Sequence, residues 1–365
     1  MIFGEEYIEK SAIVQFNSAM SQYYSIKGAL MPDAHKGYGL PIGGVVATEG
    51  VIVPSWVGYD IGCGCSSFKT PWSANELSRD MRVHIYKKIN QQVPVGFERH
   101  KNAQDWDNSD IPRTDFLNDI FRNGGSNQLN TLGGGNHFIE VGADEFGMIW
   151  VSLHSGSRGV GHKTATKYMK IAGGGKAKEG HFPLMVESQD AKDYITDMKF
   201  CLEFALENRK RMIQTVVTII SEVLGEKEYC YDMSNLINRN HNHAELTKKG
   251  LWIHRKGATH ADKGYLGVIP ANMKDGVFIV KGKGNKDSLN SSSHGAGRLL
   301  GRKVAKQTLD INEFKNIMVG IVSNADHSTL DESPMAYKDI HVVLGLQKNL
   351  IDVLHHIRPL INVKG

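Results

Sequence analysis

The chain has 365 residues, a formal net charge of +4 and 41% hydrophobic residues, as is ordinary for a soluble globular protein. No apolar run is long enough to span a membrane, and Cys63, Cys65, Cys201 and Cys230 form no evident disulfide framework. These features argue against a membrane-spanning chain and a disulfide-stapled secreted domain. The mildly basic charge permits a nucleic-acid partner without identifying one. With no signal peptide at the N-terminus, we expect a reduced, cytoplasmic protein with no membrane partner.

The first elements in chain order are short and rich in glycine. Residues 1–30 are predicted to form an entry segment with a short helix, and residues 31–39 a turn. Two β-branched runs within residues 42–53, on either side of Glu-Gly, predict a hairpin or closely paired strands. The loop 58–65 follows and places a carboxylate and a thiol three residues apart. Residues 73–92 carry the apolar spacing of a helix.

The middle of the chain alternates polar surface with apolar elements. Residues 96–115 are polar and are predicted to lie on the surface. Residues 132–141 pass from a glycine run into a strand, and residues 149–153 form a buried strand. Residues 187–224 are the longest predicted helix, and we interpret its basic segment, 209–211, as a solvated face.

The last third continues this alternation. Strands are predicted at residues 251–253 and 276–282, and a helix from about Gly295 to Lys306. A further helix is predicted through residues 354–357. No repeat, low-complexity tract or clear linker is present, so we expect one interwoven α+β domain over residues 1–365.

Five potential metal ligands stand in separate loops, most of them rich in glycine: Asp60, Cys63, His137, His154 and His241. Thiolate and imidazole suit softer divalent ions, and carboxylate suits harder ones. No local signature such as HExxH or paired CxxC is present, so a metal site would have to be assembled from distant loops. The spacing alone leaves two interpretations open, a shared metal site or separate structural histidines.

His294 differs from these histidines in its neighbours. It follows Ser292 and Ser293, precedes Arg298, and stands where a helix is expected to begin. Backbone N–H groups and an arginine suit phosphate binding, and a neutral imidazole can attack phosphorus. The alternative is a histidine that bonds to a serine at the start of a helix.

Six sequence blocks, in this order, resemble the RtcB family of RNA ligases. They are residues 31–37 (MPDAHKG), 58–64 (GYDIGCG), 135–140 (GNHFIE), 154–158 (HSGSR), 254–258 (HRKGA) and 293–298 (SHGAGR). Residues 363–365 (VKG) match as well, so the resemblance covers nearly the whole chain. It implies a domain with mixed and antiparallel sheets around a central metal and nucleotide cleft.

The resemblance implies a ligase that depends on GTP and manganese. Such an enzyme joins an RNA 3′-phosphate or 2′,3′-cyclic phosphate to a 5′-hydroxyl end in RNA repair or tRNA splicing. It proceeds through a histidine–GMP intermediate and an RNA(3′)pp(5′)G intermediate. By the same resemblance, Cys63 bridges two Mn²⁺ ions, Asp60 and His137 complete one site, and His154 and His241 complete the other. The expected partners are GTP and broken RNA, and the expected oligomeric state is a monomer.

The resemblance also assigns roles in the reaction. His294 is the nucleophile that takes up GMP, Asp33 handles protons or supports the site, and Arg298 is counted with the catalytic residues. The implied nucleotide contacts are Asn136, Glu140, Asn242, Asn272, Ser293, Gly295, Ala296, Gly297 and Lys364. The implied contacts to RNA phosphates are Arg158, Arg298 and Arg302.

The sequence departs from the family pattern at two of these positions. Residues 240–243 (NHNH) offer two histidines, and the family pattern of His followed by Asn selects His241, with His243 as the alternative. Residues 269–273 (IPANM) stand where the family has Pro-Gly-Ser-Met, and Asn272 falls in this departure.

Two other functions use the same residues. A metal-dependent RNA phosphodiesterase or phosphatase would need the metal pair and would use His294 only as a phosphate ligand. A non-catalytic RNA-binding protein would not need all of Cys63, His137, His154, His241 and His294.

Overall fold

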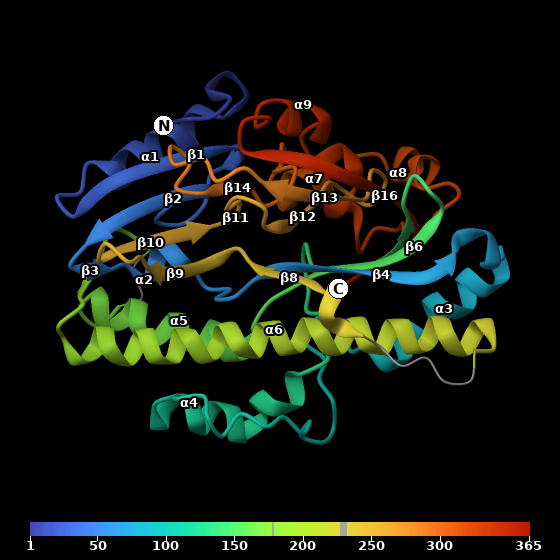
Figure 1. The fold of residues 1–365 in the computed structure, drawn as a ribbon, viewed down its shortest axis with the longest axis horizontal. Coiled ribbons are helices and arrows are strands. Elements are labelled where there is room, and N and C mark those ends of the chain that lie inside the picture. Colours follow the sequence, from blue (N-terminus) through green and yellow to red (C-terminus); the bar gives the residue numbers. More distant parts are fainter. Residues whose placement is uncertain (177–178, 227–231) are drawn as a thin grey trace.

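The longest element of the fold is helix α6 (Gln189–Leu224), which runs along one side of the molecule between the sheets and the segment that carries α4 (Asp115–Ile120) (Figure 1). The computed structural model describes residues 1–176, 179–226 and 232–365, so Cys230 lies outside the described residues. The predicted helix over 187–224 is confirmed. Ser188 caps its first turn by accepting from the Ala191 N–H at 3.2 Å, and Gly225 ends it with φ 78°.

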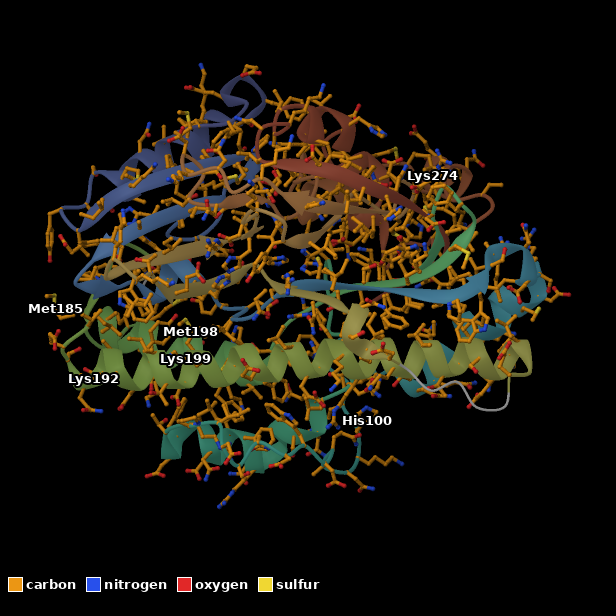
Figure 2. The ribbon with its side chains drawn as sticks, in the orientation of Figure 1. His100, Met185, Lys192, Met198, Lys199 and Lys274 are labelled. Carbon is orange, nitrogen blue, oxygen red and sulfur yellow. The ribbon has the colours of Figure 1, made fainter. Side chains whose placement is uncertain are left out.

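The two faces of α6 follow the helical period. Met198 is buried, whereas Lys192 and Lys199 are exposed (Figure 2). Further along, Val216 and Val217 of α6 pack with the sheet in the largest apolar core. Among the described residues, no helix combines the length and apolar character that a bilayer crossing requires.

An eight-stranded sheet forms the larger β-structure. Its strands follow the order β12 (Leu266–Pro270), β13 (Val277–Gly282), β16 (Ile351–Lys364), β5 (Phe138–Ala143), β6 (Met148–Ser155), β4 (Gly64–Ser73) and β8 (Ile237–Asn240). These strands pair antiparallel, and β15 (Val322–Ser323) joins β16 in parallel. The sheet curls until its end strands meet, where Arg239 Nε donates to the Leu266 carbonyl at 3.0 Å. The result is a nearly closed barrel.

A second, four-stranded sheet lies beside the first. Its order is β1 (Ser25–His35), β2 (Ile42–Glu49), β10 (Leu251–Lys256) and β9 (Asn242–Leu246), all antiparallel. Only His241 separates β8 of the large sheet from β9 of this one. The two sheets therefore meet at a potential metal ligand.

Short elements complete the structure. Two strand pairs are β3 (Val51–Ile52) with β7 (Leu184–Met185), and β11 (Ala258–His260) with β14 (Ser291–Ser293). The remaining α-helices are α1 (Lys10–Met20), α2 (Pro54–Val57), α3 (Arg79–Gln92), α5 (Arg158–Ala172), α7 (Arg302–Thr308), α8 (Ile311–Ile317) and α9 (Ile340–Gly345). Single turns lie at Glu5–Tyr7, Ala74–Glu76, Phe121–Gly125, Ser126–Gln128, Met233–Asn235, Leu330–Glu332 and Pro334–Ala336. The predicted α+β class is confirmed.

Three local predictions are wrong. Residues 354–357 lie in strand β16, where β13 supplies their ladder partners, and the strand continues beside β5 from Arg358. The helix expected from Gly295 begins only at Arg302, since Gly297 has φ 79°. The strands around Gly50 do not form a hairpin with each other, because β3 pairs with β7.

Helix α6 directs a fully buried charged side chain, Arg209, toward the large sheet. Arg209 is 0% exposed, so its interpretation as part of a solvated face is wrong. Its Nη1 donates to the carbonyl oxygens of Gly62 and Ser155, both at 2.8 Å. Its Nε donates to Asn238 at 2.7 Å and its Nη2 to Asn240 at 2.5 Å. Burial lowers its pKa to about 10, which still leaves it charged at neutral pH.

We expect Arg209→Met to lower the free energy of unfolding by more than about 3 kcal/mol, because buried carbonyl and amide oxygens lose their donor. Urea denaturation of the purified protein measures this change. The control is Arg211→Met, whose partner Glu207 lies at 2.6 Å on the half-exposed side of the helix, with an expected change below about 1 kcal/mol. Equal losses in the two variants would contradict a special role for the buried guanidinium.

Candidate functional site

Five predicted ligands come together at the ends of neighbouring strands of the large sheet. Cys63 directly precedes β4, His154 lies near the end of β6, and His241 directly follows β8. These strands are neighbours, and their register places Gly64 opposite both Ser155 and Asn240. Adjacent antiparallel strands therefore bring residues that are distant in sequence to one point.

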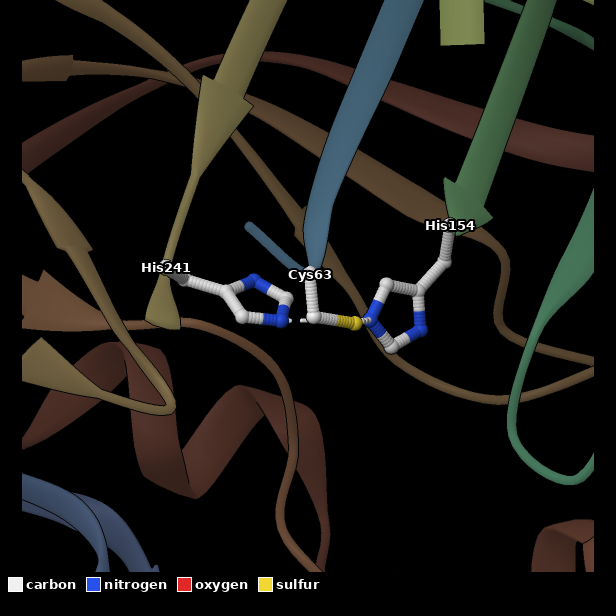
Figure 3. A group of neighbouring side chains, drawn as sticks. All are labelled: Cys63, His154 and His241. Carbon is white, nitrogen blue, oxygen red and sulfur yellow. Dashed lines mark hydrogen bonds between the residues drawn. The ribbon is translucent and has the colours of Figure 1, made fainter. Parts of the chain in front are cut away.

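The ligand atoms form two groups that share the Cys63 sulfur. In one group, His137 Nε2 lies 3.1 Å from Asp60 Oδ2 and 3.4 Å from Cys63 Sγ. In the other, Cys63 Sγ lies 3.1 Å from His154 Nε2, which lies 3.2 Å from His241 Nε2 (Figure 3). The atoms of each group lie within 4.8 Å of one another. Each group can hold a metal ion.

Hydrogen bonds orient two of the imidazoles. The Nδ1 atoms of His137 and His154 lie 3.0 and 3.3 Å from the carbonyl oxygens of Leu132 and Asn136. A carbonyl oxygen only accepts, so each Nδ1 donates and each Nε2 keeps its lone pair on the side of the sulfur. This is the arrangement in which histidine binds a metal.

The electrostatics of the cluster also suit a metal. Burial, aided by neighbouring histidines, lowers the pKa of His154 and of His241 well below the usual range, so both imidazoles are neutral. Burial and the charge of Asp60 raise the pKa of the Cys63 thiol well above its usual value. A divalent cation reverses this effect by stabilising the thiolate. The donor set thus fits transition-metal ions.

His294 lies beside this cluster, with its ring 4.7 Å from that of His241. Its Nδ1 lies 2.8 Å from Asp33 Oδ2, which also accepts from the backbone N–H groups of His294 and Gly295 at 3.2 and 3.3 Å. Burial opposes ionisation of Asp33, but the hydrogen bond and charge of His294 outweigh it, so the pKa of Asp33 lies below its usual value. The carboxylate therefore accepts a hydrogen bond from Nδ1–H of His294, and the lone pair on Nε2 stays available.

A cavity opens next to His294 and reaches the large sheet. The predicted nucleotide contacts that line it are Asn136, Glu140, Asn272, Gly295, Ala296, Gly297 and Lys364. Two cross-strand pairs of β5 and β16 form part of its wall, Phe138 opposite Lys364 and Glu140 opposite Asn362. Asn362 was not among the predicted contacts, although its i,i+2 spacing from Lys364 in a strand was an available signal.

Two predicted nucleotide contacts do not line this cavity. Asn242 links two loops, because its amide donates to the Asp60 carbonyl at 3.1 Å and accepts from the Gly257 N–H at 2.8 Å. Ser293 is fully buried, and its N–H donates to Gln347 at 3.0 Å. Both residues brace the site.

The three arginines predicted to bind phosphate differ in how far their side chains are already engaged in hydrogen bonds. Arg298 lines the cavity but already donates to Glu332 and to Tyr337, at 3.0 and 3.2 Å. Arg158 donates to Thr131 and to the Gly96 carbonyl, at 3.0 and 2.5 Å. The Arg302 side chain is 46% exposed and lies 3.5 Å from its nearest carboxylates. It is the most available of the three.

His243, the alternative ligand, belongs to another cluster. Its Nε2 lies 3.0 Å from His260 Nε2, and Glu245 completes a third group of potential ligands. Arg255 Nη1 lies 3.4 Å from both Nε2 atoms and pairs with Glu245. The Arg255 guanidinium already supplies the positive charge that a metal ion would bring to this group. His241 is therefore the histidine that faces the shared sulfur.

Burial strongly raises the pKa of Glu140. The residue is 1% exposed, and this burial raises its pKa to about 8, although Asn362 and Lys364 favour the charged form. Its carboxyl group is therefore mainly protonated at neutral pH in the free protein. A carboxyl group in this state is typical of functional sites.

The fold and the site define an α+β protein with a buried thiol–imidazole–carboxylate cluster, able to hold metal, beside a ligand cavity. The profile of the family described as "tRNA-splicing ligase RtcB" matches residues 16–365. The chain therefore belongs to the RtcB family of RNA ligases.

Individual relatives agree with this assignment. The "RNA-splicing ligase RtcB" of Escherichia coli (strain K12) is 33% identical over 379 residues, which cover 92% of this chain and 90% of the relative. The "tRNA-splicing ligase RtcB" of Archaeoglobus fulgidus is 28% identical, with 98% of this chain and 92% of the relative covered. That of Thermococcus kodakarensis is 29% identical, with 94% and 88% covered.

We expect Cys63→Ala to abolish binding at both metal positions together, because each group loses its sulfur. Metal content after dialysis against Mn²⁺ and gel filtration measures the loss. Cys65→Ala is the matched control, since Cys65 packs in an apolar cluster with Trp150 and Ile237. The control should keep its metal and lose less than about 1.5 kcal/mol of stability. Full metal occupancy in Cys63→Ala would contradict the shared-sulfur geometry.

The raised pKa of Glu140 predicts a pH-dependent effect on stability. Between the ordinary carboxyl pKa near 4.5 and the folded-state value of about 8, the unfolded chain releases the Glu140 proton while the folded protein keeps it. This residue therefore makes wild type progressively less stable as pH rises through that window. Glu140→Gln lacks this titration, so its melting temperature relative to wild type should rise from pH 5 to pH 8. A pH-independent difference between the two melting temperatures would contradict the perturbed carboxyl group.

Proposed function

We propose that this protein is a GTP-dependent RNA ligase. It joins an RNA 3′-phosphate, or a 2′,3′-cyclic phosphate opened first to the 3′-phosphate, to a 5′-hydroxyl end in RNA repair or tRNA splicing. The RNA and GTP are its substrates, the protein acts as a monomer, and residues 1–365 form one catalytic domain. The observation that carries the proposal is the Asp33–His294 pair, which stands between the metal cluster and the cavity.

The proposed first step uses the free nitrogen of His294. Its Nε2 attacks the α-phosphorus of GTP, a P–N bond forms, and pyrophosphate leaves. Asp33 accepts the Nδ1 hydrogen bond and stabilises the positive charge that develops on the imidazole. The geometry supports this role, because the same carboxylate oxygen also holds the backbone of His294 and Gly295.

The proposed later steps transfer the nucleotide and then release it. An oxygen of the RNA 3′-phosphate attacks the same phosphorus, so GMP leaves His294 and forms RNA(3′)pp(5′)G. The 5′-hydroxyl then attacks the RNA phosphorus, and GMP departs. Arg302, Arg158 and Arg298 are the proposed contacts to RNA phosphates, and the exposed Arg302 is the most available.

The proposed metal is manganese, bound as two ions by Asp60, Cys63, His137, His154 and His241. Bound at these residues, the ions would supply Lewis-acid stabilisation of the phosphates. The residues themselves contribute an oriented and mostly buried set of donors close to His294.

The test is covalent labelling with α-³²P-GTP and Mn²⁺. Wild type should acquire an acid-labile label, and His294→Ala should acquire none, because no other free imidazole is held beside the cavity by a carboxylate in the part of the chain that the structure describes. His84→Ala, at an exposed position of α3, is the control and should label like wild type.

A labelled protein should then join a 3′-phosphate RNA to a 5′-hydroxyl RNA in a gel assay. Phosphate release from the 3′-phosphate RNA without GTP, in the absence of any label, would contradict the ligase and favour the metal-dependent phosphatase.

A further inference from the structure

We infer that Asn362 reads the exocyclic 2-amino group of guanine and so helps this protein select a guanine nucleotide. The inference rests on the proposed function and adds a specificity-determining residue to it.

Strand geometry points Asn362 into the cavity. Side chains two apart in a strand lie on one face, so Asn362 and Lys364 share a side of β16, and both line the cavity. Ile361 and Val363 point the other way into the apolar core. Across the ladder, Glu140 of β5 stands directly opposite Asn362. The pair therefore forms a buried polar spot on the β5–β16 wall of the cavity.

The hydrogen bonds of this pair are incomplete. Asn362 Nδ2 donates to Glu140 Oε2 at 3.1 Å. The second oxygen of each side chain, Asn362 Oδ1 and Glu140 Oε1, is buried without a hydrogen-bond partner. Asn362 is 2% exposed and Glu140 is 1% exposed. Buried acceptors in native proteins are paired, so two adjacent orphans that line a cavity point to a ligand with two adjacent donors.

Guanine has such an edge. Its N1–H and 2-amino group present neighbouring donors. The Asn362 amide oxygen matches one of them, and Glu140 Oε1 matches the other once the carboxyl group has released its proton, a change that a bound donor favours. Adenine presents an acceptor at N1 and no group at C2, so it meets this pair with a mismatch. We assign N1–H to Glu140 and the 2-amino group to Asn362, because the amide oxygen is the acceptor that the Asn362–Glu140 bond leaves free.

Two nearby side chains do not offer a free buried acceptor. Lys364 donates to Glu332 at 3.0 Å and has no acceptor. Asn272, which also lines the cavity, has both amide atoms engaged, since it donates to Asp275 at 2.7 Å and accepts from the Lys274 and Asp275 N–H groups at 2.9 Å. Asn136 also lines the cavity, but it is exposed. The buried side-chain amide at position 362 is thus the acceptor best placed beside Glu140 for the 2-amino group.

A simpler role for Asn362 is to position Glu140. The two roles differ in their response to inosine, which keeps N1–H and lacks the 2-amino group. A positioning residue supports the binding of guanine and hypoxanthine equally. A residue that reads the 2-amino group affects guanine alone.

The experiment is calorimetric titration of the full-length protein with GMP and with IMP. Wild type should bind GMP about tenfold more tightly than IMP, the usual effect of one good hydrogen bond. Asn362→Leu should bind the two with equal affinity, and its affinity for IMP should stay within about twofold of wild type. Asn316→Leu, at an exposed position of α8, is the control and should keep the wild-type ratio.

Three results would overturn the inference. They are equal affinities of wild type for GMP and IMP, a GMP-to-IMP ratio that Asn362→Leu leaves unchanged, and parallel weakening of both nucleotides. Asn362→Thr, which suits a strand, gives the same comparison if the leucine variant is unstable. Failure of wild type to bind GMP at all would overturn the proposed function together with the inference, so the two failures are distinguishable.

Discussion

The geometry of the potential metal ligands depends on the guanidinium of Arg209. It crosses from α6 to the carbonyl oxygens of Gly62 and Ser155 and to the side chain of Asn240. Each of these residues directly adjoins a potential ligand, Cys63, His154 or His241. Three strand ends that have no covalent connection nearby are thereby fixed to one rigid side chain. Burying this charge costs desolvation free energy. The hydrogen bonds to the four surrounding acceptors offset that cost.

The site lies where the two sheets meet, and each sheet supplies a different part. The large sheet brings the shared sulfur, the imidazoles and the Glu140–Asn362 pair. The smaller sheet brings Asp33 on β1, and the neighbouring β11–β14 pair leads into His294. His241 belongs to the connection between β8 and β9, so it links the two parts directly. The proposed nucleophile and the cluster thus keep their spacing as long as the two sheets keep their packing.

The sequence predicted the class of fold and the residues of the cluster, but for different reasons. Length and alternating strand and helix patterns indicated an α+β domain. The gathering of five ligands followed from the family resemblance, because their spacing spans 181 positions from Asp60 to His241 and carries no local signature. Arg209 was missed because it stands beside two other basic residues, although its helical spacing from Ala205 and Met212 indicated a buried face. Strand β16 was missed because its apolar residues fit a helix as well as a strand until β5 and β13 are known to flank it.

The pairing of β16 with β5 has a consequence for how the molecule folds. The hydrogen bond between Asn362 and Glu140 joins residues 222 positions apart in the chain. Contacts of such separation form slowly, since the entropy of closing a long loop is lost before any contact compensates for it. Helix α6 and the β4–β6 ladder need shorter closures and can form earlier. The β5–β16 wall of the cavity would therefore form later during refolding than the helical structure of α6.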